Sequence, residues 1–188
     1  MIGYAFTGSF CTLSHSLAAL RRLRADGADV LPIFSNNVYS TDTRFWRAEE
    51  FYGAVRALCD REIIHTIVDA EPLGPAMPLE ALVIAPCTGN TLSKLSLGII
   101  DSTVAMAAKA HLRNARPLLL AIASNDALSV GLRHIGALTL RKNIFFVPFG
   151  QDDPFEKPTS LIADFSKIPK AISAAMENKQ LQPILLGS

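Results

Sequence analysis

The stretch ALVIAPCTGNTLSKL, residues 81–95, places an apolar run directly before small polar residues and a helical pattern. Residues 81–85 are continuously apolar, which is typical of a strand buried on both faces of a sheet. Pro86 ends this run, and Thr91 begins a long Ala-rich helical stretch that is interrupted near Gly98. The stretch therefore predicts a strand followed by a helix, which is the repeating unit of an α/β fold.

The same order of a short apolar run and a longer amphipathic segment recurs along the chain. Further strands are predicted at 2–6, 30–34, 118–123 and 144–147, and further helices at 13–27, 44–58, 128–140 and 168–176. Residues 62–68 fit either a helix or a strand, and 71–78 and 151–158 have the composition of a loop and a turn-rich connector. The apolar tail at 181–186 is expected to pack somewhere or to pair as an edge strand.

These elements predict an α/β, three-layer Rossmann-like fold with a parallel sheet of about six strands. No linker or repeat divides the chain, so we expect a single domain over residues 1–188, with a C-terminal helix and tail from about residue 160. Apolar residues make up 49% of the chain, which excludes a disordered or fibrous class.

The charge balance and the cysteine count limit which partners and which cellular compartment we expect. Eighteen Lys and Arg against seventeen Asp and Glu give a formal net charge of +1, so no nucleic-acid partner is expected. No apolar stretch approaches the roughly 18 residues that span a bilayer, and the sequence opens without a signal peptide. An odd count of three cysteines argues for a reducing compartment, and we expect a cytoplasmic protein without membrane contact.

Small polar residues follow several of the predicted strands. They are Thr7-Gly8-Ser9, Ser35-Asn36-Asn37, Thr88-Gly89-Asn90-Thr91 and Ser124-Asn125-Asp126. Because ligands of α/β sheets bind at the carboxyl ends of the strands, these loops are the candidate site. A glycine before a helix start favours a phosphate, although 7–9 alone also fits an ordinary turn with a Ser or Thr cap. Asp126 equally fits a helix cap.

The segment APCTGNTLSKLSLGIIDS, residues 85–102, resembles the PASANT motif of the flavoprotein family that includes peptidyl-cysteine decarboxylases and phosphopantothenoylcysteine decarboxylase. TGSFCT, SNNVYSTDTRF, AEPLGP, LVIAPCTGN, IASNDALS, KNIFFVPFGQDDPFEKP and KQLQP resemble one member of this family in the same order, from Thr7 to Pro183. The resemblance implies a Rossmann-like sheet that binds FMN.

The resemblance also implies roles for individual residues. Its expected FMN contacts are Gly8, Ser9, Ser35, Thr88, Gly89, Asn90 and Thr91. Ser124 and Asn125 fall where the decarboxylases carry a Met-Asn pair that recognises substrate. Lys94 and Arg44 are our candidates for binding substrate carboxylates, Arg44 because it follows the Ser35 loop. The catalytic histidine of the decarboxylases has no counterpart, since residues 71–79 contain no His.

The similar member implies an oxidoreductase component that helps oxidise a dihydropyridine dicarboxylate to the aromatic acid in spore-forming bacteria. That reaction removes a hydride and a proton, so it needs an electron acceptor and a base. The resemblance further implies a partner subunit that carries NAD(P), and a homo-oligomer, either a trimer or a dodecamer. The alternatives are an FMN-dependent decarboxylase, a prenyl-flavin type transferase, or a non-catalytic stabilising subunit.

Other chemistry-bearing residues receive simpler interpretations. Cys11 and His15 have a metal-compatible spacing, but no second pair supports a metal site, so none is predicted. Cys87 is expected to pack rather than act as a nucleophile, and His111 and His134 to lie at the surface or to be hydrogen-bonded. Phe45 and Trp46 fit core packing or stacking on a ring. The catalytic base is left unassigned.

Overall fold

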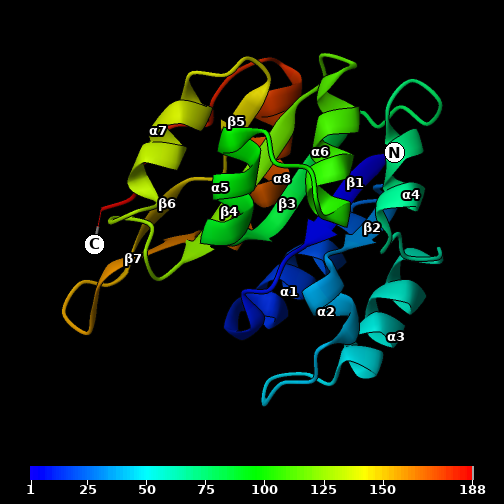
Figure 1. Cartoon of the computed structure of the whole chain (residues 1–188), viewed down its shortest axis with the longest axis horizontal. Coiled ribbons are helices and arrows are strands. Elements are labelled where there is room, and N and C mark those ends of the chain that lie inside the picture. The colour runs from blue at the N-terminus through cyan, green and yellow to red at the C-terminus, as the bar shows by residue number, and fades with distance from the viewer. Residues whose placement is uncertain (188) are drawn as a thin grey trace.

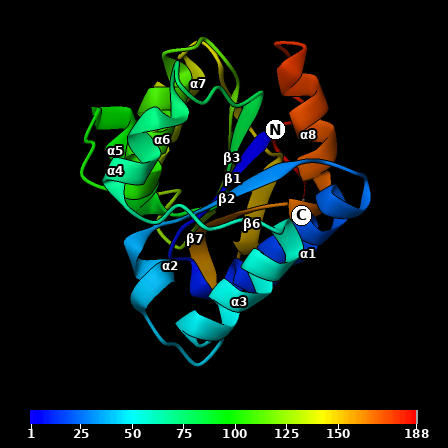
Figure 2. The ribbon, with the colours of Figure 1, turned by 90° about the vertical axis from the view of Figure 1, so that its right-hand side faces the viewer.

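A computed structural model describes residues 1–187, in which one seven-stranded sheet separates two layers of helices (Figure 1, Figure 2). The strands are β1 (Ile2–Phe6), β2 (Val30–Phe34), β3 (Ala81–Cys87), β4 (Leu118–Ser124), β5 (Ile144–Phe146), β6 (Phe149–Asp153) and β7 (Lys157–Ala163). Their order is β2-β1-β3-β4-β7-β6, with β5 also pairing with β4. The predicted α/β class and the mostly parallel sheet are confirmed.

The helices cover both faces of the sheet. They are α1 (Leu13–Ala25), α2 (Asn36–Ser40), α3 (Ala48–Cys59), α4 (Ile67–Ala70), α5 (Gly89–Leu97), α6 (Thr103–Leu112), α7 (Leu132–Thr139) and α8 (Ile168–Met176), with short 3₁₀ helices at Phe10–Thr12, Glu71–Leu73 and Phe165–Lys167. Figure 2 shows α4, α5, α6 and α7 on one face and α1, α3 and α8 on the other. No helix within residues 1–187 is both long and apolar enough to cross a bilayer.

The central strands are buried because helices cover them from both sides. Every residue of β2 and β3 is buried, and β1 is buried from Gly3 onward. β1 pairs in parallel with β2 and with β3, and β3 pairs in parallel with β4. Continuous apolar runs are the expected sequence of such two-sided strands, which is why these elements could be recognised.

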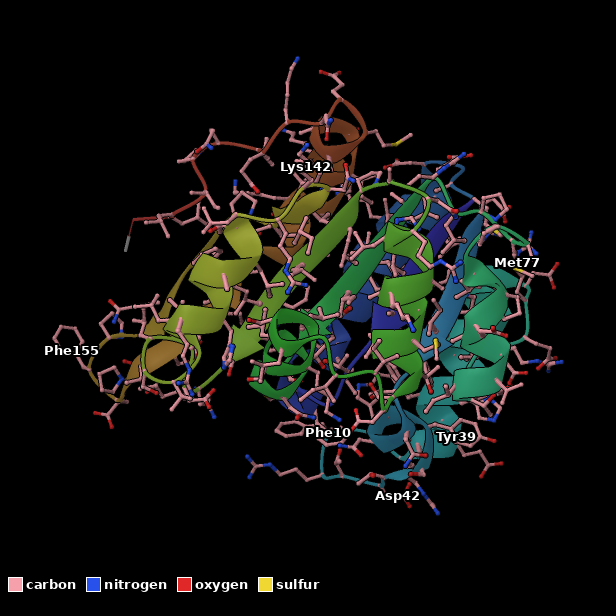
Figure 3. The ribbon with its side chains drawn as sticks, turned by 45° about the horizontal axis from the view of Figure 1, so that its top comes forward. Phe10, Tyr39, Asp42, Met77, Lys142 and Phe155 are labelled. Carbon is pink, nitrogen blue, oxygen red and sulfur yellow. The ribbon has the colours of Figure 1, made fainter. Side chains whose placement is uncertain are left out.

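Residues 151–158 are not a turn-rich connector, as the sequence predicted, but most of an antiparallel hairpin formed by β6 and β7. β7 also pairs with the end of β4, so this part of the sheet is antiparallel. Phe155 stands at the hairpin tip with 92% of its surface exposed, away from the rest of the molecule (Figure 3). The prediction failed because Asp, Pro and Lys around the tip have the composition of a loop, and because β4, the strand on which the hairpin is paired, is distant in sequence.

Helix boundaries differ from the sequence prediction at several points. α3 begins at Ala48 rather than residue 44, since Arg47 is extended and the Ala48 N–H donates to Asp42 Oδ1 at 2.9 Å. α7 begins at Leu132 rather than residue 128, after a turn in which Ser129 N donates to Asp126 O. Within 62–68, Ile64 forms a parallel bridge with Ile33, and the tail makes a single bridge at Leu185.

Two buried hydroxyls compensate for a break in β3. Pro86 has no N–H to donate, and the pairing of β3 with β4 shifts register between Ile84 and Cys87. Ser16 Oγ donates to the Ala85 carbonyl at 2.5 Å, and Thr7 Oγ1 donates to the Pro86 carbonyl at 2.7 Å. Thr7 Oγ1 also accepts from the Thr88 N–H at 3.1 Å. One buried side chain thus joins the ends of β1 and β3.

Replacing this hydroxyl by a methyl group should destabilise the fold. In Thr7→Val, the buried Pro86 carbonyl and the Thr88 N–H both lose their partner, which we expect to cost about 2 to 3 kcal/mol of unfolding free energy. Urea unfolding of this variant measures the effect. Thr41→Val, at an exposed threonine, is the control. A Thr7→Val protein as stable as the wild type would contradict the bridging role.

His111 on α6 is buried as a neutral side chain. Its Nε2 donates to the Pro117 carbonyl at 2.9 Å, and its Nδ1 has no hydrogen-bond partner among the described residues. Burial lowers the pKa of His111, the Pro117 contact opposes this shift, and nearby Arg116 adds to it. Protonation would place a second N–H at Nδ1, where the described fold supplies no acceptor. Both His111 and His134 are buried, so the surface alternative is wrong for both, while the hydrogen-bonded alternative is confirmed for His111.

This burial predicts a pH dependence of stability. Because the folded-state pKa of His111 lies below the ordinary value of about 6.5, the unfolded chain takes up the proton first as the pH falls. Above a pH of about 6.5, neutral His111 therefore makes its full contribution to the unfolding free energy. As the pH falls below this value, the contribution is lost at up to about 1.4 kcal/mol per pH unit. Urea unfolding at several pH values between 7.5 and 5 should show that the unfolding free energy falls less steeply with decreasing pH in His111→Gln than in the wild type. His15→Gln, at an exposed histidine, is the control.

Candidate functional site

The loops that follow β1, β2, β3 and β4 meet at one edge of the sheet and line two adjoining pockets. The first pocket has a volume of about 440 Å³ and is lined by Thr7, Gly8, Ser35, Asn36, Asn37, Thr88, Asn90, Thr91, Lys94, Asp101, Ser102 and Val104. In Figure 3, Phe10 and Tyr39, which come from the segments after β1 and β2, lie toward the same end of the molecule, and Lys142 lies toward the opposite end.

The second pocket has a volume of about 630 Å³. It is lined by Gly8, Ser9, Phe10, Cys11, Arg44, Phe45, Thr88, Gly89, Asn90, Ala123, Ser124, Asn125, Asp126 and Lys157. Gly8, Thr88 and Asn90 line both pockets, so the two are neighbours. Both volumes lie within the range of about 300 to 1,000 Å³ that is typical of small-molecule sites.

The first pocket is rich in hydrogen-bonding groups. Thr88 caps α5, because its Oγ1 accepts from the Thr91 N–H at 3.3 Å, and Ser35 caps α2 in the same way through Val38. Lys94 lies one turn into α5, and its Nζ is 2.7 Å from Asp101 Oδ1. The Lys94 ammonium holds the pKa of the Asp101 carboxyl below its usual range. Hydroxyl, amide and ammonium donors in one pocket suit a phosphate.

Gly89 is required by the close approach of the loop after β4. A Cβ at this position would lie 2.6 Å from Ser124 Oγ and 2.8 Å from Asp126 Oδ1. The Ser124 hydroxyl donates a hydrogen bond to the same atom, Asp126 Oδ1. The sequence prediction that Asp126 caps a helix is wrong, because α7 starts only at Leu132 and the carboxylate is bonded to Ser124.

The hairpin braces the loop that carries Asn125. Thr159 Oγ1 donates to the Asn125 carbonyl at 2.6 Å, and Leu128 N donates to the Thr159 carbonyl at 2.9 Å. The buried Ser160 hydroxyl is 3.4 Å from Asn125 Oδ1. The hairpin therefore fixes the position of the second pocket's wall and also supplies Lys157 to it.

Every residue that the sequence assigned to cofactor or substrate lies in one of these pockets. Lys94, however, lines the first pocket, whereas Arg44, Ser124 and Asn125 line the second. Among the charged lining residues, Asp101 and Lys157 were not predicted, and Asp126, which belongs to a candidate loop, was given no role in binding. Asp126 could have been found from its place directly after β4, but no local signal marks Asp101 or Lys157.

The cysteines, His15 and the two aromatic residues considered in the sequence lie in different environments. Cys87 is fully buried, and burial raises the pKa of its thiol, so packing is the correct interpretation. Cys11 lines the second pocket, whereas His15 lines a separate groove on α1. Trp46 packs on Phe51 with its Nε1 donating to Ser14, while Phe45 is 45% exposed. Residues 1–187 contain no cluster of three or more potential metal ligands.

Comparison with known proteins places the chain in a class. The flavoprotein family matches residues 1–177, and the chain therefore belongs to this family. The B subunit of dipicolinate synthase from Bacillus subtilis (strain 168) is 48% identical over 185 residues, covering 98% of this chain and 92% of that protein.

Solved structures agree with this placement. The crystal structure of the corresponding dipicolinate synthase subunit from Bacillus halodurans is 42% identical, covers 100% of this chain and 96% of its own, and has a TM-score of 0.91. A dodecameric FMN-dependent Ubix-like decarboxylase from Escherichia coli O157:H7 shares the fold at 21% identity, with coverage of 78% and 79% and a TM-score of 0.58.

Two glycine substitutions test the contact at Gly89. Gly89→Ala must displace Ser124 and Asp126 or break their hydrogen bond, and we expect it to cost about 1 to 2 kcal/mol of unfolding free energy. Gly53→Ala, in the exposed part of α3 with open space around it, should stabilise by about 0.5 to 1 kcal/mol. Urea unfolding of both variants gives the comparison. A stabilised Gly89→Ala protein would show that the close approach is absent.

Proposed function

We propose that this chain is the FMN-binding subunit of an oxidoreductase that converts dihydrodipicolinate to dipicolinate. The observation that carries the proposal is the convergence of the assigned residues on two adjoining pockets at the carboxyl edge of the sheet. The identity of 48% to a dipicolinate synthase subunit supports the choice of substrate. We further propose that the protein acts in the cytoplasm of the mother cell of a spore-forming bacterium.

The residues of the two pockets fit FMN. Ser35, Thr88 and Asn90 offer donors for a phosphate in the first pocket, and the start of α5 adds its positive dipole end. Gly8 lines both pockets and places no side chain at the boundary between them. Phe10 and Phe45 give the second pocket aromatic walls against which a flat ring can pack. Bound flavin would supply a two-electron acceptor for the substrate's hydride.

The second pocket suits a substrate with two carboxylates. Arg44 and Lys157 both line it, and Lys157 Nζ is already 2.9 Å from Asp152 Oδ2. Asn125 lines the same pocket. We assign substrate carboxylates to Arg44 and Lys157, and we assign Lys94 to the anion of the first pocket. The division follows from which pocket each cation lines.

The nicotinamide cofactor is assigned to a partner. The loop after β1 carries only Gly8, so it lacks the three-glycine turn that dinucleotide sites use. Because the similar protein is the B subunit of its enzyme, we propose that a different polypeptide, the A subunit of dipicolinate synthase, binds NAD(P) and completes the enzyme.

A decarboxylase remains the second candidate function, favoured by the shared fold. Cysteine decarboxylation by this family's route would need a positioned histidine. Among the described residues, none of the four histidines lines either pocket. A non-catalytic stabilising subunit is the other alternative, and the flavin absorbance of the purified protein distinguishes it.

A homo-oligomer, either a trimer or a dodecamer, is proposed from the family resemblance alone. The small side chains of α6 would allow close helix contact between subunits, but its alanines 105, 107, 108 and 110 are buried within the chain. They pack against the chain's own helices and sheet. Sedimentation velocity tests the oligomer, since a particle of 20.3 kDa would contradict it.

A charge placed in the first loop tests flavin binding. Ser9 lines the second pocket directly beside Gly8, which lines both pockets, so in Ser9→Asp the new carboxylate repels the FMN phosphate across their boundary, and we expect FMN affinity to fall by at least about 10-fold. Titration of FMN against the apo-protein, followed by flavin fluorescence, measures the change. Ser173→Asp, at an exposed position of α8, adds the same charge away from the pockets and should bind like the wild type. Equal affinity in both variants would refute the assignment.

The chain alone should not turn over dihydrodipicolinate. Since the nicotinamide site is assigned to the partner polypeptide, we expect activity only when both proteins and NAD(P) are present. Formation of dipicolinate, followed by its ultraviolet absorbance with and without each component, measures this. Steady multiple turnovers by the chain alone would contradict the proposed division of labour.

A further inference from the structure

One carboxylate lies in the second pocket. Among its described lining residues, Asp126 is the single Asp or Glu. The backbone carbonyl of Asp126 accepts from Ser129 N and Gly131 N, each at 3.1 Å, so the turn after β4 holds the residue in place. The Ser124 hydroxyl donates to Oδ1 of the same residue. Hydrogen bonds to the backbone and to the side chain of Asp126 therefore fix where its carboxylate lies.

Asp126 also lies against the segment assigned to the flavin. A Cβ on Gly89 would be 2.8 Å from Asp126 Oδ1, so only a residue without a side chain lets the carboxylate reach this backbone. Gly89 is the first residue of α5, directly after Thr88, which lines both pockets. Asp126 thus stands between the assigned flavin segment and the assigned substrate pocket.

The histidines of the chain lie elsewhere. His15 lines a groove between α1 and the segment after β7, and His65 stacks on Tyr39 with ring centroids 3.9 Å apart. His111 and His134 are buried. Aromatisation of a dihydropyridine needs a proton acceptor, and a carboxylate is a common one in enzymes. The second pocket supplies Asp126 for this purpose, in the same pocket as the cations Arg44 and Lys157.

Resting on the proposed function, we propose that the Asp126 carboxylate is the general base that takes the ring proton of the substrate. One ring C–H bond breaks, its proton passes to Asp126, and its electron pair forms the double bond that completes the aromatic ring. The hydride leaves from the neighbouring ring carbon to the electron acceptor, a flavin or a nicotinamide. The substrate loses one proton and one hydride in total, and Asp126 later returns its proton to water.

Ser124 is a positioning residue in this arrangement. Its hydroxyl occupies Oδ1 of Asp126, so Oδ2 is the oxygen that takes the proton. Arg44 and Lys157 bind the substrate carboxylates and offset the negative charge of Asp126 in the same pocket.

The test uses Asp126→Asn in the complex of this chain with its partner protein. The amide has the same shape and still accepts from Ser124, but it is not a base. We expect kcat to fall by at least about 100-fold. The binding of dipicolinate, measured by calorimetry on the same complex, should tighten about fivefold, because the variant removes a negative charge that faces a dianion. Asp26→Asn, at an exposed carboxylate after α1, should keep the wild-type kcat.

Chemical rescue gives a second readout. Asp126→Ala removes the base and leaves space for a small carboxylate, so added formate should raise the kcat of this variant at least about tenfold, a fraction of the gain that general base catalysis provides. A structural defect would not respond to formate. The wild type should not be accelerated.

The outcomes separate the two proposals. An Asp126→Asn enzyme that keeps more than a tenth of the wild-type kcat, or that loses dipicolinate binding together with activity, overturns the role of Asp126 and leaves the proposed function standing. A wild-type complex that neither binds dipicolinate nor forms it overturns the proposed function, and the role of Asp126 with it.

Discussion

The buried hydroxyl of Thr7 holds together the parts of the fold on which the site depends. It donates to the Pro86 carbonyl and accepts from the Thr88 N–H, so the end of β1 is tied to the end of β3 and to the start of α5. Ser16 makes the companion bond to Ala85 from α1. Since Pro86 cannot continue the ladder, these hydroxyls replace sheet hydrogen bonds and set where the first and third loops lie.

The parallel part of the sheet could be predicted from the sequence because two-sided burial leaves a local mark. The runs at 2–6 and 30–34 match β1 and β2 residue for residue, and 168–176 matches α8. The place of the candidate site followed from topology, since the carboxyl ends of parallel strands meet at one edge. That reasoning located Gly8, Ser35 and Thr88 in the pockets without any contact being known.

What could not be predicted depends on contacts between distant segments. β7 pairs with β4 through Ala123 and Ile162, and nothing in residues 151–158 signals this partner. Asp126 could be located after β4, but its contact could not be predicted, because its local sequence fits a helix cap equally well and its carboxylate approaches α5 only where Gly89 has no side chain. Lys157 enters the site only because the hairpin forms.

The two pockets contain different sets of charged side chains, and each set suits the binding of a ligand. The first pairs Lys94 with Asp101, and the second sets two cations against Asp126. Gly8 lies at their boundary, and the described glycines with positive φ are Gly27 and Gly98, so Gly8 is not needed for a left-handed backbone. A Cβ there would meet Asn37 at 3.6 Å, which is an ordinary contact. Gly8 lines both pockets, so a ligand that occupies both would lie against a residue without a side chain at their boundary.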